Sequence, residues 1–255
     1  WIFSGAVDRL EGAPGSGETV AVVASDGSFV AQAAYSPVSQ IRARVWTLDR
    51  DVQIGEGFFR TRLLAALDLR KVAGVEQETD AYRLVHGESD GLPGLVVDRY
   101  GDVLVMQVLS AGIECWREKI ADLLVEVTGV SAVYERSDVD VRELEGLEPR
   151  VGRVRGAEPP GEITIRENGL AYGVDVRGGQ KTGFYLDQRR SRMRLRAYAQ
   201  GKVVLNCFCY TGGFSLSALA GGAEQGLSID SSGGALEEAQ RSGALPAEGI
   251  KERAG

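Results

Sequence analysis

Hydrophobic and polar residues alternate with a period of two along the first 54 residues. Three such runs, ETVAVVAS, FVAQAAYS and QIRARVWTL, are flanked by the turn-forming segments APGSG, SDGS and SPVS. Alternation of this kind, bounded by glycine, proline and serine, is typical of antiparallel strands joined by tight turns. Residues 1–54 are therefore predicted to form a small β unit.

A helical period follows in the segment EGFFRTRLLAALDLRKVAG. Its apolar residues Phe58, Leu63, Leu67 and Leu69 fall near one face among arginines, and a glycine ends the pattern. This spacing predicts a helix over 55–74 that links two domains.

Short strands and one amphipathic helix are predicted over residues 75–175. The helix runs from about Gly112 to Val127, after a hairpin that bends at DRYGD, and a strand to Tyr134 follows it. The segment ITIRENGLAYGVDV adds further short strands. Antiparallel strands flanked by helices define a second domain of the α+β class.

A different order of elements begins at residue 176. A basic helix over Asp187–Tyr198 precedes the buried strand KVVLNCFC, a glycine turn, the helix FSLSALAGGA, the strand GLSID and the helix start GGALEEAQ. A strand, a helix and a second strand in this order form a β-α-β unit with parallel strands. Because a doubly wound sheet has about five or more strands, residues 176–255 are predicted to be only the first part of such a domain. The tail RSGALPAEGIKERAG carries no further strand signal.

Composition narrows the class of protein. The 255 residues are 44% hydrophobic, yet no apolar run approaches the length of a membrane span, so a globular protein without a membrane partner is expected. Three cysteines and one histidine cannot form a disulfide framework and leave too few ligands for structural zinc, so no metal and a reducing cytoplasm are expected. The start WIFSGAVDRL has neither Met nor the pattern of a secretory signal, which predicts a piece of a longer gene product.

The net charge of −7 argues against attraction of nucleic acid to the whole surface. One local patch has the opposite sign, because residues 177–202 contain eight lysines and arginines and the single acid Asp187. Such a patch is either a solvated helix face or a nucleic-acid contact.

The turn after the first strand of the β-α-β unit, in LNCFCYTGGFS, is a candidate ligand site. A glycine-rich turn that opens a helix presents free backbone N–H groups at the carboxyl edge of the sheet. Asp230 ends the second strand, where a carboxylate accepts hydrogen bonds from two ribose hydroxyls. Together these features indicate a cofactor that contains adenosine, although a turn without a ligand would have the same pattern.

The chemistry of the turn distinguishes between cofactors. Neither the G-x-G-x-x-G of dinucleotide sites nor the G-K-[ST] of phosphate loops is present. S-adenosylmethionine has no phosphate to bind, and NCFCYTGG satisfies the looser turn that its sites tolerate. Asn206 stands where many such sites have an acid. We therefore expect S-adenosylmethionine, and a nucleotide-dependent oxidoreductase is disfavoured.

Two blocks, GGQKTGFYLDQRRSR from residue 178 and LNCFCYTGGFSLSAL, resemble the bacterial family of ribosomal RNA large-subunit methyltransferases that make 5-methylcytosine in 23S rRNA. WIFSGAV, AAYSPVSQIRARVW, YRLVHGESDGLPGLVVDRYGD and YERSDVDVRELEGL extend the resemblance over essentially the whole chain. The resemblance implies an α/β and α+β multidomain protein, truncated here at both ends. A PUA-like small β-barrel that binds RNA (1–54) would be followed by a linker helix (55–74), a central α+β domain (75–175) and an incomplete Rossmann-like class I methyltransferase domain (176–255).

Two sets of site residues follow from the turn and from the resemblance. The residues expected at the cofactor are Tyr185, Asp187, Gln188, Arg189, Asn206, Phe208, Tyr210, Thr211, Gly212, Gly213 and Asp230. Those expected at RNA are Arg42, Arg44, Lys181, Arg190 and Arg192, although alternation on a strand equally makes Arg42 and Arg44 an ordinary exposed face. The implied partners are large-subunit ribosomal RNA and a second copy in a homodimer.

Methylation of cytosine at carbon 5 requires a cysteine thiolate that adds to carbon 6 of the base. Cys207 and Cys209 would share one face of their strand, packed against a helix or the ligand, so we expect both to be packing residues. Cys115 and His86 are expected to be structural. The resemblance places the nucleophile beyond Gly255, which predicts a chain that is inactive alone. A non-catalytic RNA-binding protein with a vestigial methyltransferase domain is the alternative.

Overall fold

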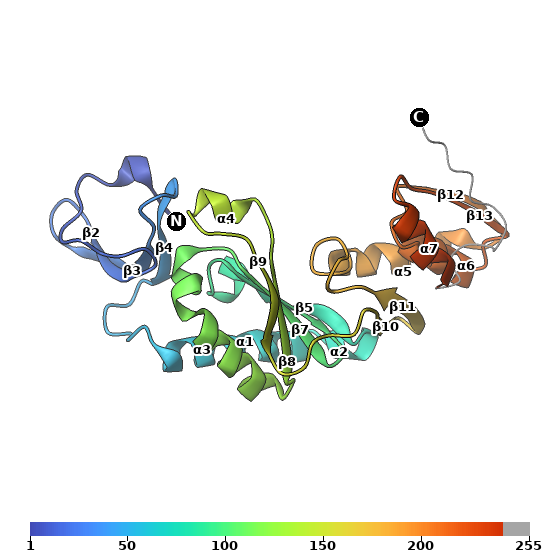
Figure 1. Cartoon of the computed structure of the whole chain (residues 1–255), viewed down its shortest axis with the longest axis horizontal. Helices are drawn as coiled ribbons and strands as arrows, with labels where there is room; N and C mark the ends of the chain where they lie inside the picture. Colours follow the sequence, from blue (N-terminus) through green and yellow to red (C-terminus); the bar gives the residue numbers. More distant parts are fainter. Residues whose placement is uncertain (242–255) are drawn as a thin grey trace. The chain divides into compact units, whose positions relative to one another are not determined.

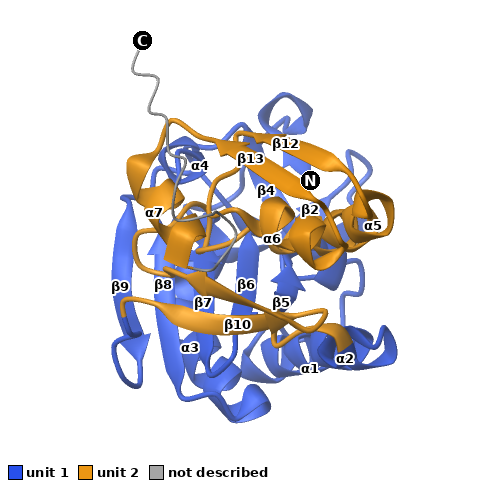
Figure 2. Ribbon diagram, turned by 90° about the vertical axis from the view of Figure 1, so that its right-hand side faces the viewer, with its two compact units in different colours: residues 1–77, 82–160 blue, residues 78–81, 161–255 orange. Residues whose placement is uncertain are grey.

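The computed structural model describes residues 1–241, and the chain divides into two compact units. Unit 1 comprises Trp1–Gln77 and Tyr82–Pro160, and unit 2 comprises Glu78–Ala81 and Gly161–Gly255 (Figures 1 and 2). The predicted tail after Arg241 lies outside the described residues. None of the helices formed by residues 1–241 combines the length and the apolar character needed to cross a bilayer.

The alternating N-terminal segment forms a four-stranded antiparallel sheet in unit 1. Its strands are β1 (Ile2–Phe3), β2 (Thr19–Val23), β3 (Phe29–Tyr35) and β4 (Ile41–Thr47), in the order β1-β4-β3-β2. A short 3-10 turn, η1 (Ser4–Ala6), follows β1.

A second sheet in unit 1 has the order β5-β6-β7-β8-β9. Its central strands β7 and β8 are parallel because the helix α3 connects them, whereas β6–β7 and β8–β9 pair antiparallel. Every residue of β7 and β8 is buried. The elements of this part are α1 (Glu56–Val72), α2 (Val75–Glu78), β5 (Ala81–His86), η2 (Gly87–Asp90), β6 (Leu95–Tyr100), β7 (Val103–Val108), α3 (Ala111–Thr128), β8 (Ala132–Ser137), α4 (Val141–Leu144) and β9 (Arg150–Arg155).

One apolar core joins the two sheets of unit 1. Trp46 of β4 contacts Phe59 of α1 edge to face, with ring centroids 5.5 Å apart. A side chain at Gly112 of α3 would lie only 2.4 Å from the Cβ of Ala34, so the helix packs directly on β3. Residues 55–74, expected to be a linker, thus pack in the same compact unit as the residues before and after them.

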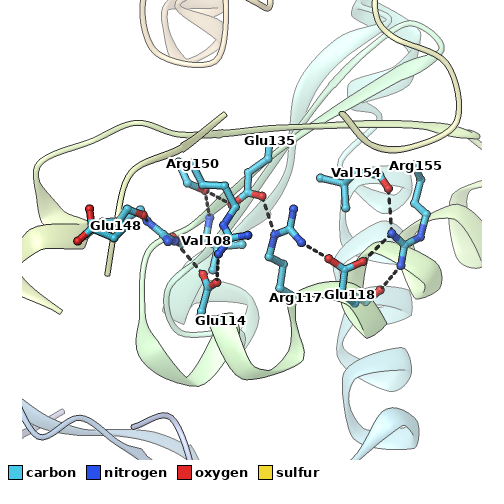
Figure 3. Close-up of polar contacts among 11 residues, drawn as sticks. Val108, Glu114, Arg117, Glu118, Glu135, Glu148, Arg150, Val154 and Arg155 are labelled. Atoms are coloured by element: carbon cyan, nitrogen blue, oxygen red, sulfur yellow. Dashed lines mark hydrogen bonds and ion pairs between the residues drawn. The ribbon is translucent and has the colours of Figure 1, made fainter. Parts of the chain in front are cut away.

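Charged side chains connect α3 to the edge of the second sheet (Figure 3). Arg117 donates to the fully buried Glu135 at 2.7 Å, and Glu114 accepts from Arg150 at 3.0 Å. Arg142, with 1% of its side chain exposed, donates to Glu114 as well and to the carbonyls of Val108 and Glu148. Buried charges are tolerated only when paired in this way, so these contacts serve the fold.

Unit 2 contains the predicted β-α-β unit. Strands β12 (Val203–Cys207) and β13 (Gln225–Ile229) pair in parallel, with Val203 opposite Gln225, and α6 (Gly213–Ala220) connects them. Around them lie the hairpin β10 (Ile163–Glu167) and β11 (Leu170–Val174), the 3-10 turn η3 (Leu186–Gln188), and the helices α5 (Arg189–Ala199) and α7 (Gly233–Arg241).

The hairpin β10–β11 belongs to unit 2, whereas the sequence placed it in the central domain. Its buried Glu167 pairs with Arg192 of α5, and the hydroxyl of Tyr172 contacts Ser217 of α6 at 3.1 Å. These side-chain contacts tie the hairpin to the β-α-β unit, so the boundary between the units falls at Pro160 rather than after residue 175.

Candidate cofactor site

Unit 2 contains a pocket of about 490 Å³ at the carboxyl ends of β12 and β13. This is the edge of a parallel sheet at which ligands of open α/β folds bind. The segment before α5, the turn before α6 and the end of β13 form its wall. The lining residues are Gln180, Phe184, Tyr185, Gln188, Arg192, Phe208, Cys209, Tyr210, Thr211, Gly213, Phe214, Asp230 and Ser231.

The turn between β12 and α6 has an uncommon backbone. Four non-glycine residues in the described part of the chain have a left-handed φ, and two of them, Phe208 at 60° and Tyr210 at 51°, lie in this turn. A third, Lys181 at 59°, lies in the segment opposite. Such conformations cost about 1–3 kcal/mol each and concentrate at functional sites.

Asp230 fixes the turn and still faces the pocket. Its Oδ2 accepts the backbone N–H of Tyr210 at 2.7 Å, and its Oδ1 accepts that of Ser232 at 2.9 Å. A carboxylate has about four acceptor positions, so both oxygens retain the capacity to accept from a ligand hydroxyl. The ribose assignment of Asp230 stays a prediction.

Tyr210 connects the turn to the opposite wall. Its hydroxyl donates to the carbonyl of Gly183 at 3.1 Å and accepts the N–H of Gln180 at 3.0 Å, while Tyr185 donates its own hydroxyl to the Gln180 side chain. Burial raises the pKa of Tyr210 to about 12, so this hydroxyl stays protonated and able to donate well above neutral pH. Gly179 allows the close approach, because a Cβ there would lie 3.1 Å from the Tyr210 hydroxyl and 2.3 Å from the carbonyl of Asp175.

Arg192 is part of this wall and anchors it to the β10–β11 hairpin. Its guanidinium makes a two-point ion pair with Glu167, at 2.7 and 2.6 Å, with 3% and 2% of the two side chains exposed. It also donates to the carbonyl of Tyr185 at 3.0 Å and lies 4.5 Å from the centre of the Phe184 ring. The structure contradicts the expectation that Arg192 contacts RNA, because its side chain is 3% exposed and pairs with Glu167 inside unit 2.

Four of the residues expected at the cofactor do not line the pocket. Arg189 pairs with Glu78 at 3.0 Å, and Asp187 is exposed to solvent. Asn206 donates its amide to Ser215 at 2.8 Å within the β-α-β unit, and Gly212 supplies the left-handed residue that begins α6. The seven that line it are Tyr185, Gln188, Phe208, Tyr210, Thr211, Gly213 and Asp230.

Sequence reasoning missed Gln180, Phe184, Phe214 and Ser231, which also line the pocket. All four lie inside or next to the quoted motifs: Gln180 and Phe184 in GGQKTGFYLDQ, Phe214 in LNCFCYTGGFS, and Ser231 directly after Asp230. Phe214 follows the glycine pair. The motifs thus located the wall, but only the fold shows which of their side chains reach it.

The residues expected at RNA have different environments. Arg44 is buried and pairs with Glu145 at 2.9 Å and Glu88 at 3.1 Å, so it is a structural residue of unit 1 and not a phosphate contact. Arg42 is half-buried and donates to the carbonyls of Ser36 and Pro37. Lys181 and Arg190 are exposed.

The two cysteines of the opening strand do not share a face. Cys207 is exposed, whereas Cys209 is buried and lines the pocket. The left-handed residue Phe208 between them interrupts the alternation of the strand, which is why the predicted common face is wrong. Burial, and then the negative charge of Asp230, raise the pKa of the Cys209 thiol to about 11. Cys209 is therefore a buried, neutral thiol, as expected, whereas the packing role expected of Cys207 is wrong because that residue is exposed.

Among residues 1–241, no three histidine, cysteine, aspartate or glutamate side chains are grouped so that they could hold a metal ion.

Two parts of the chain are similar to known domain families. Residues 151–249 match the family model described as S-adenosylmethionine-dependent methyltransferase, and residues 1–48 match that of a PUA-like domain. These matches confirm the expected fold class and S-adenosylmethionine as the expected cofactor.

Relatives of the chain are named more specifically. A ribosomal RNA large subunit methyltransferase I from Photobacterium profundum is 52% identical over 94% of this chain, and one from Klebsiella pneumoniae is 51% identical over the same share. The chain spans 61% and 60% of the lengths of these curated relatives. A proposed SAM-dependent methyltransferase from Streptococcus mutans has a similar structure, with a TM-score of 0.79, 26% identity, and coverage of 94% of this chain and 61% of that one. A proposed methyltransferase complexed with SAH is also similar, with a TM-score of 0.81 and 26% identity. The match covers 94% of this chain and 60% of that one.

Replacement of Arg192 by Met is expected to lower the free energy of unfolding of unit 2 by about 3–5 kcal/mol, because it leaves Glu167 buried without a partner. Denaturant titration followed by far-ultraviolet circular dichroism measures this. Arg194→Met on the same helix is the control, since Arg194 is exposed. Equal stability of the two variants would contradict the assignment of Arg192.

Alkylation by iodoacetamide at about pH 8 is expected to modify Cys207 and to spare Cys209 in the native protein. With a raised pKa of about 11, the thiolate fraction of Cys209 at that pH is on the order of one in a thousand, and the thiol is buried as well. Fragmentation mass spectrometry of the shared peptide distinguishes the two sites. Denaturant should expose both, and equal rates in the native protein would refute the packing role.

Proposed function

We propose that the protein transfers the methyl group of S-adenosylmethionine to carbon 5 of a cytosine in 23S ribosomal RNA, in the cytoplasm. The observation that carries the proposal is the pocket at the end of β12 and β13, with Asp230 and two left-handed residues in its wall. The large-subunit RNA methyltransferase relatives support the substrate class.

In this proposal Asp230 binds the ribose hydroxyls of the cofactor, because its carboxylate lies at the strand end with free acceptor capacity. Phe208 offers an apolar ring beside it, with 90% of the residue exposed at the pocket wall. Tyr185 and Gln188 close the opposite side, and the hydroxyl of Tyr210 connects the turn to that side. The cofactor supplies the electrophilic methyl group, and these residues hold it in place.

The reaction also needs a thiolate that adds to carbon 6 of the cytosine, which makes carbon 5 nucleophilic, and a base that removes the carbon 5 proton afterwards. Cys209 does not suit this role, because its thiol is buried and its pKa is raised. Cys207 does not line the pocket. In the proposal neither of these two cysteines supplies the thiolate. Assembly as a homodimer stays a prediction.

Deletion of the gene that encodes this chain from its native host is expected to remove one 5-methylcytosine from 23S rRNA. Bisulfite sequencing of the rRNA locates the change, and reintroduction of the gene restores it. Loss of a different methylated nucleoside would overturn the cytosine assignment. An unchanged set of modifications would favour the non-catalytic RNA-binding protein.

A further inference from the structure

The five arginines of α5 fall into two groups. Three are held by partners within unit 2: Arg189 by Glu78, Arg192 by Glu167, and Arg196 by the carbonyl of Asn168 at 2.8 Å. Arg190 and Arg194 are exposed, and no carboxylate among residues 1–241 pairs with either of them. Contacts within unit 2 therefore explain three of these arginines, but not Arg190 and Arg194.

The two exposed arginines lie on one face of α5 together with an exposed aromatic ring. Arg190, Arg194 and Tyr198 follow one another at intervals of four residues, so they form a stripe about 12 Å long. Tyr198 is 76% exposed, and Met193 beside the stripe is 44% exposed. We call Arg190, Arg194 and Tyr198 the α5 stripe. The helix contains no acidic residue that would oppose an anion.

Two cations and a projecting aromatic ring match one kind of ligand. Guanidinium groups bind phosphate oxygens, and an exposed tyrosine ring provides a platform on which a base can stack. A base is free to stack on protein only where it is not already stacked in a duplex. The stripe therefore fits an unpaired segment of RNA better than a continuous helix.

The helix that carries the α5 stripe also contributes to the wall of the candidate cofactor site. Arg192 of α5 lines the pocket, and Arg190 and Arg194, each two residues away from it, lie on another face of the same helix. A methyltransferase that acts on carbon 5 needs its target base out of the stack, so unpaired nucleotides must lie next to the pocket. An RNA segment bound on α5 would therefore be held by a helix that also forms part of the pocket wall.

We propose that the α5 stripe binds an unpaired segment of the RNA substrate, with Arg190 and Arg194 on phosphates and Tyr198 stacked on a base. This rests on the proposed function for the presence of an RNA substrate. It moves the RNA contact of this helix from Arg192, which is buried, to the opposite face. It also adds Tyr198, which amino-acid composition and charge do not indicate.

Fluorescence anisotropy of the chain with a labelled single-stranded oligoribonucleotide and with a duplex of the same length tests the proposal. Arg190→Gln with Arg194→Gln should weaken binding of the single strand about tenfold and reduce the slope of log K against log salt by about 1.4, since each phosphate contact contributes about 0.7. Tyr198→Leu should weaken binding of the single strand at least fivefold and leave the duplex unchanged. Tyr198→Phe, which keeps the ring, should bind like the wild type.

Lys71→Gln with Lys119→Gln is the matched control, because it removes two exposed charges from unit 1. An equal loss in this variant, or wild-type affinity in Tyr198→Leu, would overturn the proposal. Wild-type RNA binding by the double arginine variant would also overturn the proposal and would favour a protein partner for the stripe. S-adenosylmethionine titration should be unaffected in all of these variants. If the gene deletion removes 5-methylcytosine while the stripe variants bind RNA normally, only the stripe assignment fails.

Discussion

The buried ion pair between Arg192 and Glu167 is the interaction on which the candidate site depends. One guanidinium holds the β10–β11 hairpin, the carbonyl of Tyr185 and the ring of Phe184 at once. A pair with almost no exposure gains little net stability over an apolar contact, but it is strongly destabilising when one partner is lost. Its consequence is geometric, because it fixes the segment before α5 as a wall of the pocket opposite the turn that Asp230 holds.

The same helix shows how one basic segment serves two purposes. Arg189 and Arg192 are paired with carboxylates within unit 2, whereas Arg190 and Arg194 are exposed to solvent. A helix places residues three and four apart on one face, so the division follows directly from the sequence spacing once one contact is known. The cofactor pocket and the proposed RNA contact can thus share α5 without competing for the same side chains.

The sequence predicted the β-α-β unit, its turn and Asp230 because these follow from local patterns: a buried strand, a glycine pair and an acid at a strand end. It could not separate Arg192 from Arg190, since burial of Arg192 depends on Glu167, which is distant in sequence and lies in a hairpin assigned to another domain. The common face predicted for Cys207 and Cys209 was wrong for a related reason. The left-handed backbone of Phe208 is set by the packing of the turn, and no pattern of side chains in the sequence predicts it.

Isothermal titration of S-adenosylmethionine into the protein, with Asp230→Asn and Asp187→Asn as paired variants, tests the central claim most directly. Both changes remove one negative charge within the motifs that indicated the cofactor, but only Asp230 lines the pocket. The account predicts a loss of affinity of about tenfold or more for Asp230→Asn and wild-type affinity for Asp187→Asn. Wild-type affinity in Asp230→Asn, or a comparable loss in Asp187→Asn, would contradict it.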